Sequence, residues 1–373
     1  MRFEFATATR IVYGAGAVAD LDGAVAVFGS TPLLVTGASG EQRARSLMSP
    51  ADVHLVSGEP TIDSVRKGVD RARESRCDVV VSFGGGSAID AGKAIAALLT
   101  NGGDPLDYAE VIGAGKPLGK ASAPFIAVPT TAGTGSEVTR NAVLGSPEHG
   151  VKVSLRSPHM LARLAIVDPE LTYDLPRDVT AHTGLDALTQ LLEPFVSVRA
   201  NPMTDGFCRE GLEIAAHSLR RAYVHGDDHE ARAGMSLASL LSGLALANAG
   251  LGAVHGFAAP IGGMFHAPHG AVCAALLPHA TAVNMSALWS RAPHGEALRR
   301  YEEAGRILTS SGPLTQWLAQ LVSDLAIPPL RDYGVSQKDV PMLVEKAKAA
   351  SSMKSNPIVL TTGELTEILE GAL

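Results

Sequence analysis

The chain has 373 residues, more than one hydrophobic core usually supports, so two domains are expected. Hydrophobic residues make up 46% of it and charged residues 18%, which describes a globular protein and excludes a disordered chain. A formal charge of −7 argues against nucleic acid and against an anionic membrane surface as partners.

The cysteines and the apolar runs indicate where in the cell the protein is expected. Three scattered cysteines without CxxC spacing do not indicate a disulfide framework or a thiolate zinc site, and they fit a reducing, cytoplasmic location. The N-terminal MRFEFATATRI lacks the apolar run of a signal peptide. The run 233–265 comes nearest to a membrane span, but its Gly, Asn, Ser and His content is typical of a buried helix pair.

Residues 1–176 alternate short β-branched runs with helical patterns. Strands are expected at 10–14, 31–37, 53–58, 77–83, 124–131, 152–157 and 161–168, and helices at 61–76 and 88–100. The run CDVVVSF (77–83) is continuously apolar, as in a strand buried on both faces of a parallel sheet. The alternation predicts a doubly wound α/β domain with a parallel sheet, the architecture that binds dinucleotides.

Residues 177–373 carry helical patterns throughout. Helices are expected at 180–197, 203–222, 228–249, 252–265, 270–286, 296–311, 313–325, 336–351 and 363–372. Prolines fall near the expected breaks, at Pro194, Pro202, Pro268, Pro278, Pro313 and Pro341. We therefore expect an all-α domain after the α/β domain, with the functional site in a cleft between them.

A Gly-rich turn follows the most apolar strand. Gly84, Gly85 and Gly86 stand between strand and helix, where a diphosphate can approach free backbone N–H groups. Ser87 and Asp90 are expected to cap the helix, and Lys93 lies one turn further on. The turn differs from GxGxxG, so by itself it also fits tight packing.

A second polar loop follows the next buried strand. It carries Thr130, Thr131, Thr134 and Ser136, at the strand end where α/β sheets bind ligands, and Lys152 could add a charge. A hydroxyl-rich turn can also satisfy its own backbone, but two such loops at neighbouring strands favour a dinucleotide.

The choice between NAD and NADP depends on the end of strand 31–37. Gly37 stands where an acidic residue would hold the ribose 2′-hydroxyl and repel a 2′-phosphate. With Arg43 and Arg45 nearby, NADP would meet no repulsion, so the sequence favours NADP(H) slightly over NAD(H).

The stretch 248–279 is rich in Gly and Ala, almost free of charge, and unusual for its histidines. These are His255, His266, His269 and His279. Asp186 lies upstream with Gln190 one turn later on the same helix face. Any single histidine here could be a hydrogen-bonded core residue, but together with the carboxylate they indicate a divalent metal.

These segments resemble the iron-containing (group III) alcohol dehydrogenase family, whose relatives include glycerol dehydrogenase, maleylacetate reductase and dehydroquinate synthase. The resemblance covers nearly the whole chain, through RIVYGAG, FGGGSAIDAGKAIA, PTTAGTGSEVT, VDPELTYDLP, TGLDALTQLLE, VHGFAAPIGGMFHAPHG and NPIVLTTGELTEIL. It implies a dinucleotide-binding α/β domain, a helical domain, and Fe²⁺ or Zn²⁺ in the cleft.

The resemblance also implies ligands. The family uses an Asp, a His four residues later, and two further His; here these positions hold Asp186, Gln190, His255 and His269. Gln190 departs from the pattern, as does Ala259 where the family often has another His. An amide oxygen is a poor ligand, but an Asp and two His suffice for a catalytic zinc, and glycerol dehydrogenase resembles that arrangement.

Other residues near these ligands could be structural or functional. His266 either caps a loop or lines the pocket as a catalytic group, and Glu193 either orients a ligand or forms a helix salt bridge. Cys273 reads as inert packing and His182 as structural. Leu251, Phe257 and Phe265 are expected to line an apolar substrate pocket.

The sequence thus predicts reversible hydride transfer between a nicotinamide and a small alcohol or aldehyde, assisted by a metal acting as a Lewis acid. The alternative is a metal-independent reductase of the maleylacetate type on the same scaffold. A dehydroquinate-synthase-type lyase fits less well, because residues 180–300 contain no Lys to hold a phosphorylated substrate. A nucleotide-binding sensor is disfavoured by the ligand set, and the family resemblance implies a homo-oligomer, dimer or larger.

Overall fold

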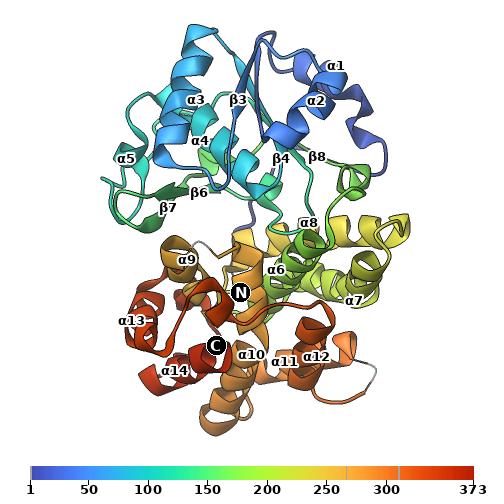
Figure 1. Ribbon diagram of the computed structural model, residues 1–373, viewed down its shortest axis with the longest axis vertical. Coiled ribbons are helices and arrows are strands. Elements are labelled where there is room, and N and C mark those ends of the chain that lie inside the picture. Colours follow the sequence, from blue (N-terminus) through green and yellow to red (C-terminus); the bar gives the residue numbers. More distant parts are fainter. Residues whose placement is uncertain (1, 266, 310) are drawn as a thin grey trace. The chain divides into compact units, whose positions relative to one another are not determined.

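The computed structural model describes residues 2–265, 267–309 and 311–373, which form two compact units. The α/β unit comprises Ala6–Thr131 and Gly135–Thr172. The helical unit comprises Tyr173–Leu373 with the short segment Ala132–Thr134 and the residues that precede Ala6. Figure 1 shows the first unit in blue to green and the second in green to red.

The α/β unit is built on one parallel sheet of six strands in the order β1-β8-β5-β4-β2-β3. The strands are β1 (Ile11–Tyr13), β2 (Pro32–Thr36), β3 (Asp52–Leu55), β4 (Val79–Gly84), β5 (Phe125–Pro129) and β8 (Leu164–Val167). Each pair runs parallel, which confirms the predicted sheet. All residues of β2, β4 and β5 are buried, as the continuous apolar runs predicted.

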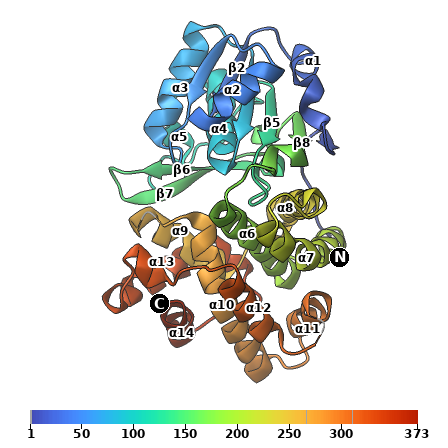
Figure 2. The ribbon, with the colours of Figure 1, turned by 45° about the vertical axis from the view of Figure 1, so that its right-hand side comes forward.

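Helices cover both faces of this sheet (Figure 2). Successive side chains of β4 alternate between faces: Val79, Val81 and Phe83 pack with residues of α1 (Leu21–Ala26) and α2 (Ala38–Leu47). The opposite face carries α4 (Gly86–Asn101). There Gly92 permits a close approach, because a Cβ would lie 1.9 Å from Ser82 Oγ.

The remaining elements of this unit flank the sheet. They are α3 (Ile62–Glu74), α5 (Pro105–Tyr108) and an antiparallel pair formed by β6 (Asn141–Ser146) and β7 (Val151–Arg156). The strand expected at 152–157 is β7, which pairs with β6 and not with the parallel sheet. Strand β6 was not predicted, because its side chains alternate between buried and partly exposed positions.

The helical unit consists of nine helices among its described residues. They are α6 (Arg177–Val196), α7 (Pro202–Val224), α8 (His229–Ala249), α9 (Ala253–Phe265), α10 (His269–Arg291), α11 (Glu296–Leu308), α12 (Leu314–Asp324), α13 (Val340–Ala349) and α14 (Thr362–Gly371). All nine were predicted. Two of the prolines expected near the breaks, Pro194 and Pro278, lie within α6 and α10, as the predicted helix ranges 180–197 and 270–286 also have them. Both residues are buried, so tertiary packing outweighs the lost backbone hydrogen bond there.

Helix α6 is the centre of this unit. It packs against α7, α8 and α10, and it is buried continuously from Gly184 to Val196. In the described chain, α10 is long and apolar enough to pass as a membrane span, as would α8 and α9 taken as one bent pair. Within the most apolar 18 residues of α10, 78% are buried inside the protein, so α10 fits equally well as a core helix.

Candidate functional site

Three polar side chains line one face of α6. Asp186, Gln190 and Glu193 occupy positions i, i+4 and i+7 of this helix, so they follow one another along the same stripe. All three are buried in a helix otherwise packed with Leu and Ala. Buried polar groups need partners, and these find them on α9 and α10.

Glu193 fixes the start of α9. Its Oε1 accepts the backbone N–H of Val254 at 2.7 Å, and its Oε2 lies 2.7 Å from Nδ1 of His255. A carboxylate accepts only, so Nδ1 carries a proton, and the neutral imidazole keeps its lone pair on Nε2. Glu193 therefore prepares His255 as a ligand through Nε2.

The first turn of α10 supplies two more side chains. His269 is its first residue and Cys273 stands one turn later on the same face. The turn lies close to α6, because a Cβ on Gly270 would fall 2.2 Å from the His182 carbonyl oxygen. Gly270 thus allows α10 to bring His269 beside Asp186.

The ligand-type atoms of Asp186, His255, His269 and Cys273 lie within 4.8 Å of one another. Asp186 Oδ1 is 3.4 Å from His255 Nε2 and 3.7 Å from His269 Nε2. Within the described chain this oxygen is buried and has no hydrogen-bond partner. A buried carboxylate oxygen left unpaired is costly, and a divalent cation would satisfy it, so the four residues fit a metal site. We call them the donor group.

Mutual charge sets the ionisation of the donor group. Burial opposes the charged forms, yet the neighbouring Cys273, Asp186 and Glu193 raise the pKa of His255 well above its ordinary value. The pKa of His269 is also raised despite burial, by Cys273 and Asp186. Burial likewise acts to raise the pKa of Asp186, but His269, His255 and Gln190 lower it. The pocket stabilises paired opposite charges, as a cation site does.

In the α/β unit, the two loops predicted to hold a dinucleotide lie at neighbouring strands. Gly84 of β4 pairs in register with Pro129 of β5, and Thr130 donates its backbone N–H to the Gly84 carbonyl at 3.0 Å. Gly85 is the N-cap of α4, and a Cβ there would lie 3.3 Å from the Thr131 side chain. The Gly-rich turn, with Gly86 as the first residue of α4, therefore borders the threonine loop at the carboxyl edge of the sheet.

The capping predicted for α4 was wrong. The helix begins at Gly86 with Gly85 as N-cap and no side-chain cap, so Ser87 lies within its first turn. Asp90 instead accepts the backbone N–H of Val143 at 2.9 Å and pairs with Lys93 at 3.0 Å.

Lys93 has a structural role. Its Nζ is buried and donates to Asp90, to Thr139 Oγ1 at 2.9 Å and to the Asn141 carbonyl at 2.6 Å. All three ammonium donors are thereby used. This arrangement ties α4 to β6 and gives no support to the predicted contact with a dinucleotide.

The other predicted cofactor residues are dispersed. Thr134 belongs to the segment that packs on the helical unit, where Ser242 Oγ donates to the Gly133 carbonyl at 3.4 Å. Ser136 is buried at the start of a short 3₁₀ turn. Lys152 lies on β7 and pairs with Glu59 at 2.6 Å.

Gly37 is the N-cap of α2, in extended conformation at the end of β2. Arg45 pairs with Glu41 at 2.9 Å, and Arg43 donates to the Glu170 carbonyl at 3.1 Å. Both arginines thus have protein partners, which weakens the case they made for NADP(H).

His182 and His279 are not among the four residues of the donor group. His266 lies outside the described residues. Burial lowers the pKa of His182 and of His279, as for neutral core imidazoles. Phe257 is fully buried, so it packs the core and does not line an open pocket.

Sequence reasoning missed two supports of the site. Asn356 accepts the backbone N–H of Ala253 at 3.0 Å and exchanges hydrogen bonds with Asn284. It thereby holds the start of α9 from a segment about a hundred residues away. The motif NPIV was visible in the sequence, but nothing local indicated this partner.

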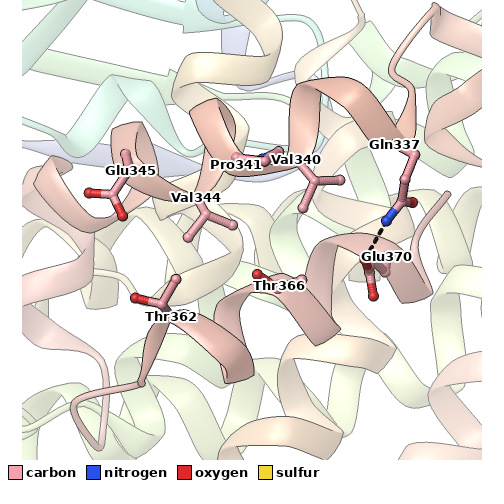
Figure 3. Close-up of a pocket in the computed structure, with 8 residues that line it drawn as sticks. All are labelled: Gln337, Val340, Pro341, Val344, Glu345, Thr362, Thr366 and Glu370. Carbon is pink, nitrogen blue, oxygen red and sulfur yellow. Dashed lines mark hydrogen bonds between the residues drawn. The ribbon is translucent and has the colours of Figure 1, made fainter.

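The helical unit also has a surface pocket of about 360 Å³ between α13 and α14 (Figure 3). It is lined by Gln337, Val340, Pro341, Val344, Glu345, Thr362, Thr366 and Glu370. The Gln337 amide donates to Glu370 across one end. No residue of the donor group lines it, so it is separate from the chemistry described above.

The α/β unit has a Gly-rich turn at a helix N-terminus, and the helical unit has a buried carboxylate–imidazole donor group. Both features fit a metal-dependent dehydrogenase. The model of the iron-containing alcohol dehydrogenase family matches residues 8–169, and that of the C-terminal part of the Fe-containing family matches residues 180–373. The chain belongs to the iron-containing alcohol dehydrogenase family and is an oxidoreductase of the alcohol dehydrogenase type.

Three similar proteins illustrate the relationship. Alcohol dehydrogenase 4 of Schizosaccharomyces pombe is 39% identical over 330 residues, covering 86% of this chain and 75% of its own. The crystal structure of a 1,3-propanediol oxidoreductase matches all of both chains with a TM-score of 0.90 and 32% identity. A sulfoacetaldehyde reductase from Bifidobacterium kashiwanohense, solved with NAD⁺, matches 100% of this chain and 99% of its own with a TM-score of 0.88 and 29% identity.

Proposed function

We propose that the protein catalyses reversible hydride transfer between a nicotinamide dinucleotide and a small alcohol or aldehyde, with one divalent metal held by Asp186, His255 and His269. The observation that carries the proposal is Asp186 Oδ1, a buried carboxylate oxygen without a hydrogen-bond partner that faces two imidazole Nε2 atoms. A cation at this place supplies Lewis-acid polarisation of an alcohol or carbonyl oxygen.

The side chains around the donor group prepare it for this chemistry. Glu193 keeps the His255 proton on Nδ1, and burial of Asp186 and His255 excludes water from that side. The His269 side chain is 36% exposed, against 3% for Asp186 and 7% for His255. Substrate therefore approaches from the His269 side.

The α/β unit supplies the place for the dinucleotide. The Gly84–Gly86 turn and the neighbouring Thr130 and Thr131 offer backbone N–H groups and hydroxyls at a helix N-terminus, which suits a diphosphate. The sulfoacetaldehyde reductase with NAD⁺ bound supports a nicotinamide dinucleotide. Gly37 presents no carboxylate to a 2′-phosphate, so NADP(H) is accepted as well as NAD(H).

The metal-independent alternative explains the donor group poorly. A reductase of the maleylacetate type would have no use for a carboxylate facing two imidazoles and a thiol. The predicted cytoplasmic location and homo-oligomeric state stay predictions.

The test measures metal content and turnover together. The purified protein is assayed with both dinucleotides and a panel of short alcohols, diols and aldehydes, before and after chelation. We expect about one divalent metal per chain and loss of turnover on chelation that added Zn²⁺ or Fe²⁺ restores. His269→Ala should abolish both metal binding and turnover and leave the fold. Full turnover by metal-free protein would refute the metal's role, and no oxidation of either reduced dinucleotide with any aldehyde would refute hydride transfer.

A further inference from the structure

Cys273 lies among the ligand atoms and not in the packed core. It stands on α10 one turn after His269 and is fully buried. Its Sγ is 3.7 Å from His255 Nε2 and 3.7 Å from His269 Nε2. The sulfur thus faces the same two nitrogen atoms that face Asp186 Oδ1.

Four of the six separations among these atoms come close to the edges of one coordination tetrahedron, and the other two are within 4.8 Å. Metal bonds of about 2.0–2.2 Å to nitrogen or oxygen and about 2.3 Å to sulfur place tetrahedral donors about 3.3–3.6 Å apart. The observed separations are 3.4 and 3.7 Å from oxygen to nitrogen and 3.7 Å for both sulfur–nitrogen pairs. Small shifts of the side chains would bring all four to bonding distance of one ion.

Gln190 is the competing fourth ligand. It lies one turn after Asp186 on the same face of α6, where its amide can orient that carboxylate. Its Oε1 is buried without a partner among the described residues, so it too could face the ion. A neutral amide oxygen is nevertheless a much weaker ligand for zinc than a thiolate, which loses its proton to solvent on binding.

We propose that Cys273 is the fourth protein ligand of the metal, as a thiolate, and that it makes the site selective for Zn²⁺ over Fe²⁺. This rests on the proposed function in that it requires a metal at the donor group. A site of carboxylate, imidazole and amide already binds Zn²⁺ more tightly than Fe²⁺, and a soft thiolate ligand enlarges that preference. With four protein ligands in place, a zinc ion could still polarise a substrate oxygen, because zinc can expand its coordination.

Cobalt(II) is the probe. The metal-stripped full chain is titrated anaerobically with Co²⁺ while its absorption spectrum is recorded. We expect visible d–d bands of a tetrahedral site together with a near-ultraviolet thiolate-to-cobalt charge-transfer band. Cys273→Ser should lose the charge-transfer band, keep the d–d bands, and bind Zn²⁺ roughly 10- to 100-fold more weakly, at least the loss that removing a ligand's outer partner produces.

Two matched variants complete the experiment. Cys77→Ser alters a buried cysteine of the α/β unit and should leave the spectrum unchanged. Gln190→Leu should keep the charge-transfer band. In competition between Zn²⁺ and Fe²⁺, Cys273→Ser should lose at least tenfold of the wild-type preference for zinc.

The outcomes separate this inference from the proposed function. Cobalt d–d bands without a charge-transfer band in the wild type would overturn the thiolate ligand and leave the metal-dependent enzyme standing. If Gln190→Leu loses cobalt binding and Cys273→Ser binds cobalt as the wild type does, the fourth ligand is Gln190 and the inference is overturned. No cobalt binding at all would overturn both.

Discussion

Glu193 is not a metal ligand in our proposal, yet its replacement by Gln should weaken metal binding. The carboxylate accepts two hydrogen bonds at 2.7 Å, from Val254 N and from His255 Nδ1, with one oxygen each. A glutamine has one oxygen and one NH₂. If the oxygen keeps Val254, the NH₂ faces Nδ1, and the imidazole must move its proton to Nε2, the atom that should bind the metal.

The alternative amide orientation has its own cost. It would set the NH₂ against the Val254 N–H and leave that buried donor unpaired, at about 1–3 kcal/mol. Removing a partner of this kind from a metal-bound histidine weakens metal affinity about 10- to 100-fold, or roughly 1.4–2.7 kcal/mol. We expect a loss of affinity of that size in Glu193→Gln.

The assay is a Zn²⁺ titration of metal-stripped protein against a competing chelator, with unfolding followed in parallel. Asp205→Asn is the matched control, because Asp205 is a buried carboxylate of the same unit that pairs with Arg300 at 2.6 Å. The control should lose stability and keep its zinc affinity. If folded Glu193→Gln binds zinc as tightly as the wild type, the assigned role of Glu193 is wrong.

Three further variants test the α/β unit. Gly37 has extended φ and ψ, and a Cβ there would meet only the Val56 carbonyl at 3.8 Å, so Gly37→Asp should fold. The new carboxylate should weaken NADPH binding at least tenfold (~1.4 kcal/mol) relative to NADH binding. An unchanged ratio of the two affinities would contradict the placement of the ribose. Lys93→Met should lower the free energy of unfolding by about 3–5 kcal/mol, because Asp90 loses its buried partner, and should leave dinucleotide affinity unchanged. A variant that keeps its stability but binds the dinucleotide more weakly would show that Lys93 contacts the dinucleotide. Burial raises the pKa of Glu137 from 4.5 to about 7, so the folded chain holds this proton more tightly than the unfolded chain. The stability from this group is present below pH 4.5 and is lost as the pH rises through about 7. Compared by chemical unfolding from pH 4.5 to about pH 8, Glu137→Gln should therefore gain up to about 3 kcal/mol on the wild type, and a constant difference would show that Glu137 ionises freely.

Most of the fold could be predicted from local sequence patterns. The period of apolar residues and the Gly-rich turn depend on neighbours within a few positions, so they predicted the strands of the parallel sheet and the nine helices. Strand β6, and with it the antiparallel pairing of β7, was not predicted, since a partly exposed ribbon leaves a weak apolar pattern.

The sequence by itself determined that Asp186, His255 and His269 are ligand-type residues on helices, because their chemistry and spacing are local properties. Tertiary structure decided which atoms meet: it brought Cys273 into the donor group, set Glu193 behind His255, and turned Lys93 inward to the Asn141 carbonyl. A side chain's partner depends on how distant helices pack, and close approaches such as that at Gly270 fix this packing. No pattern within a single helix contains that information.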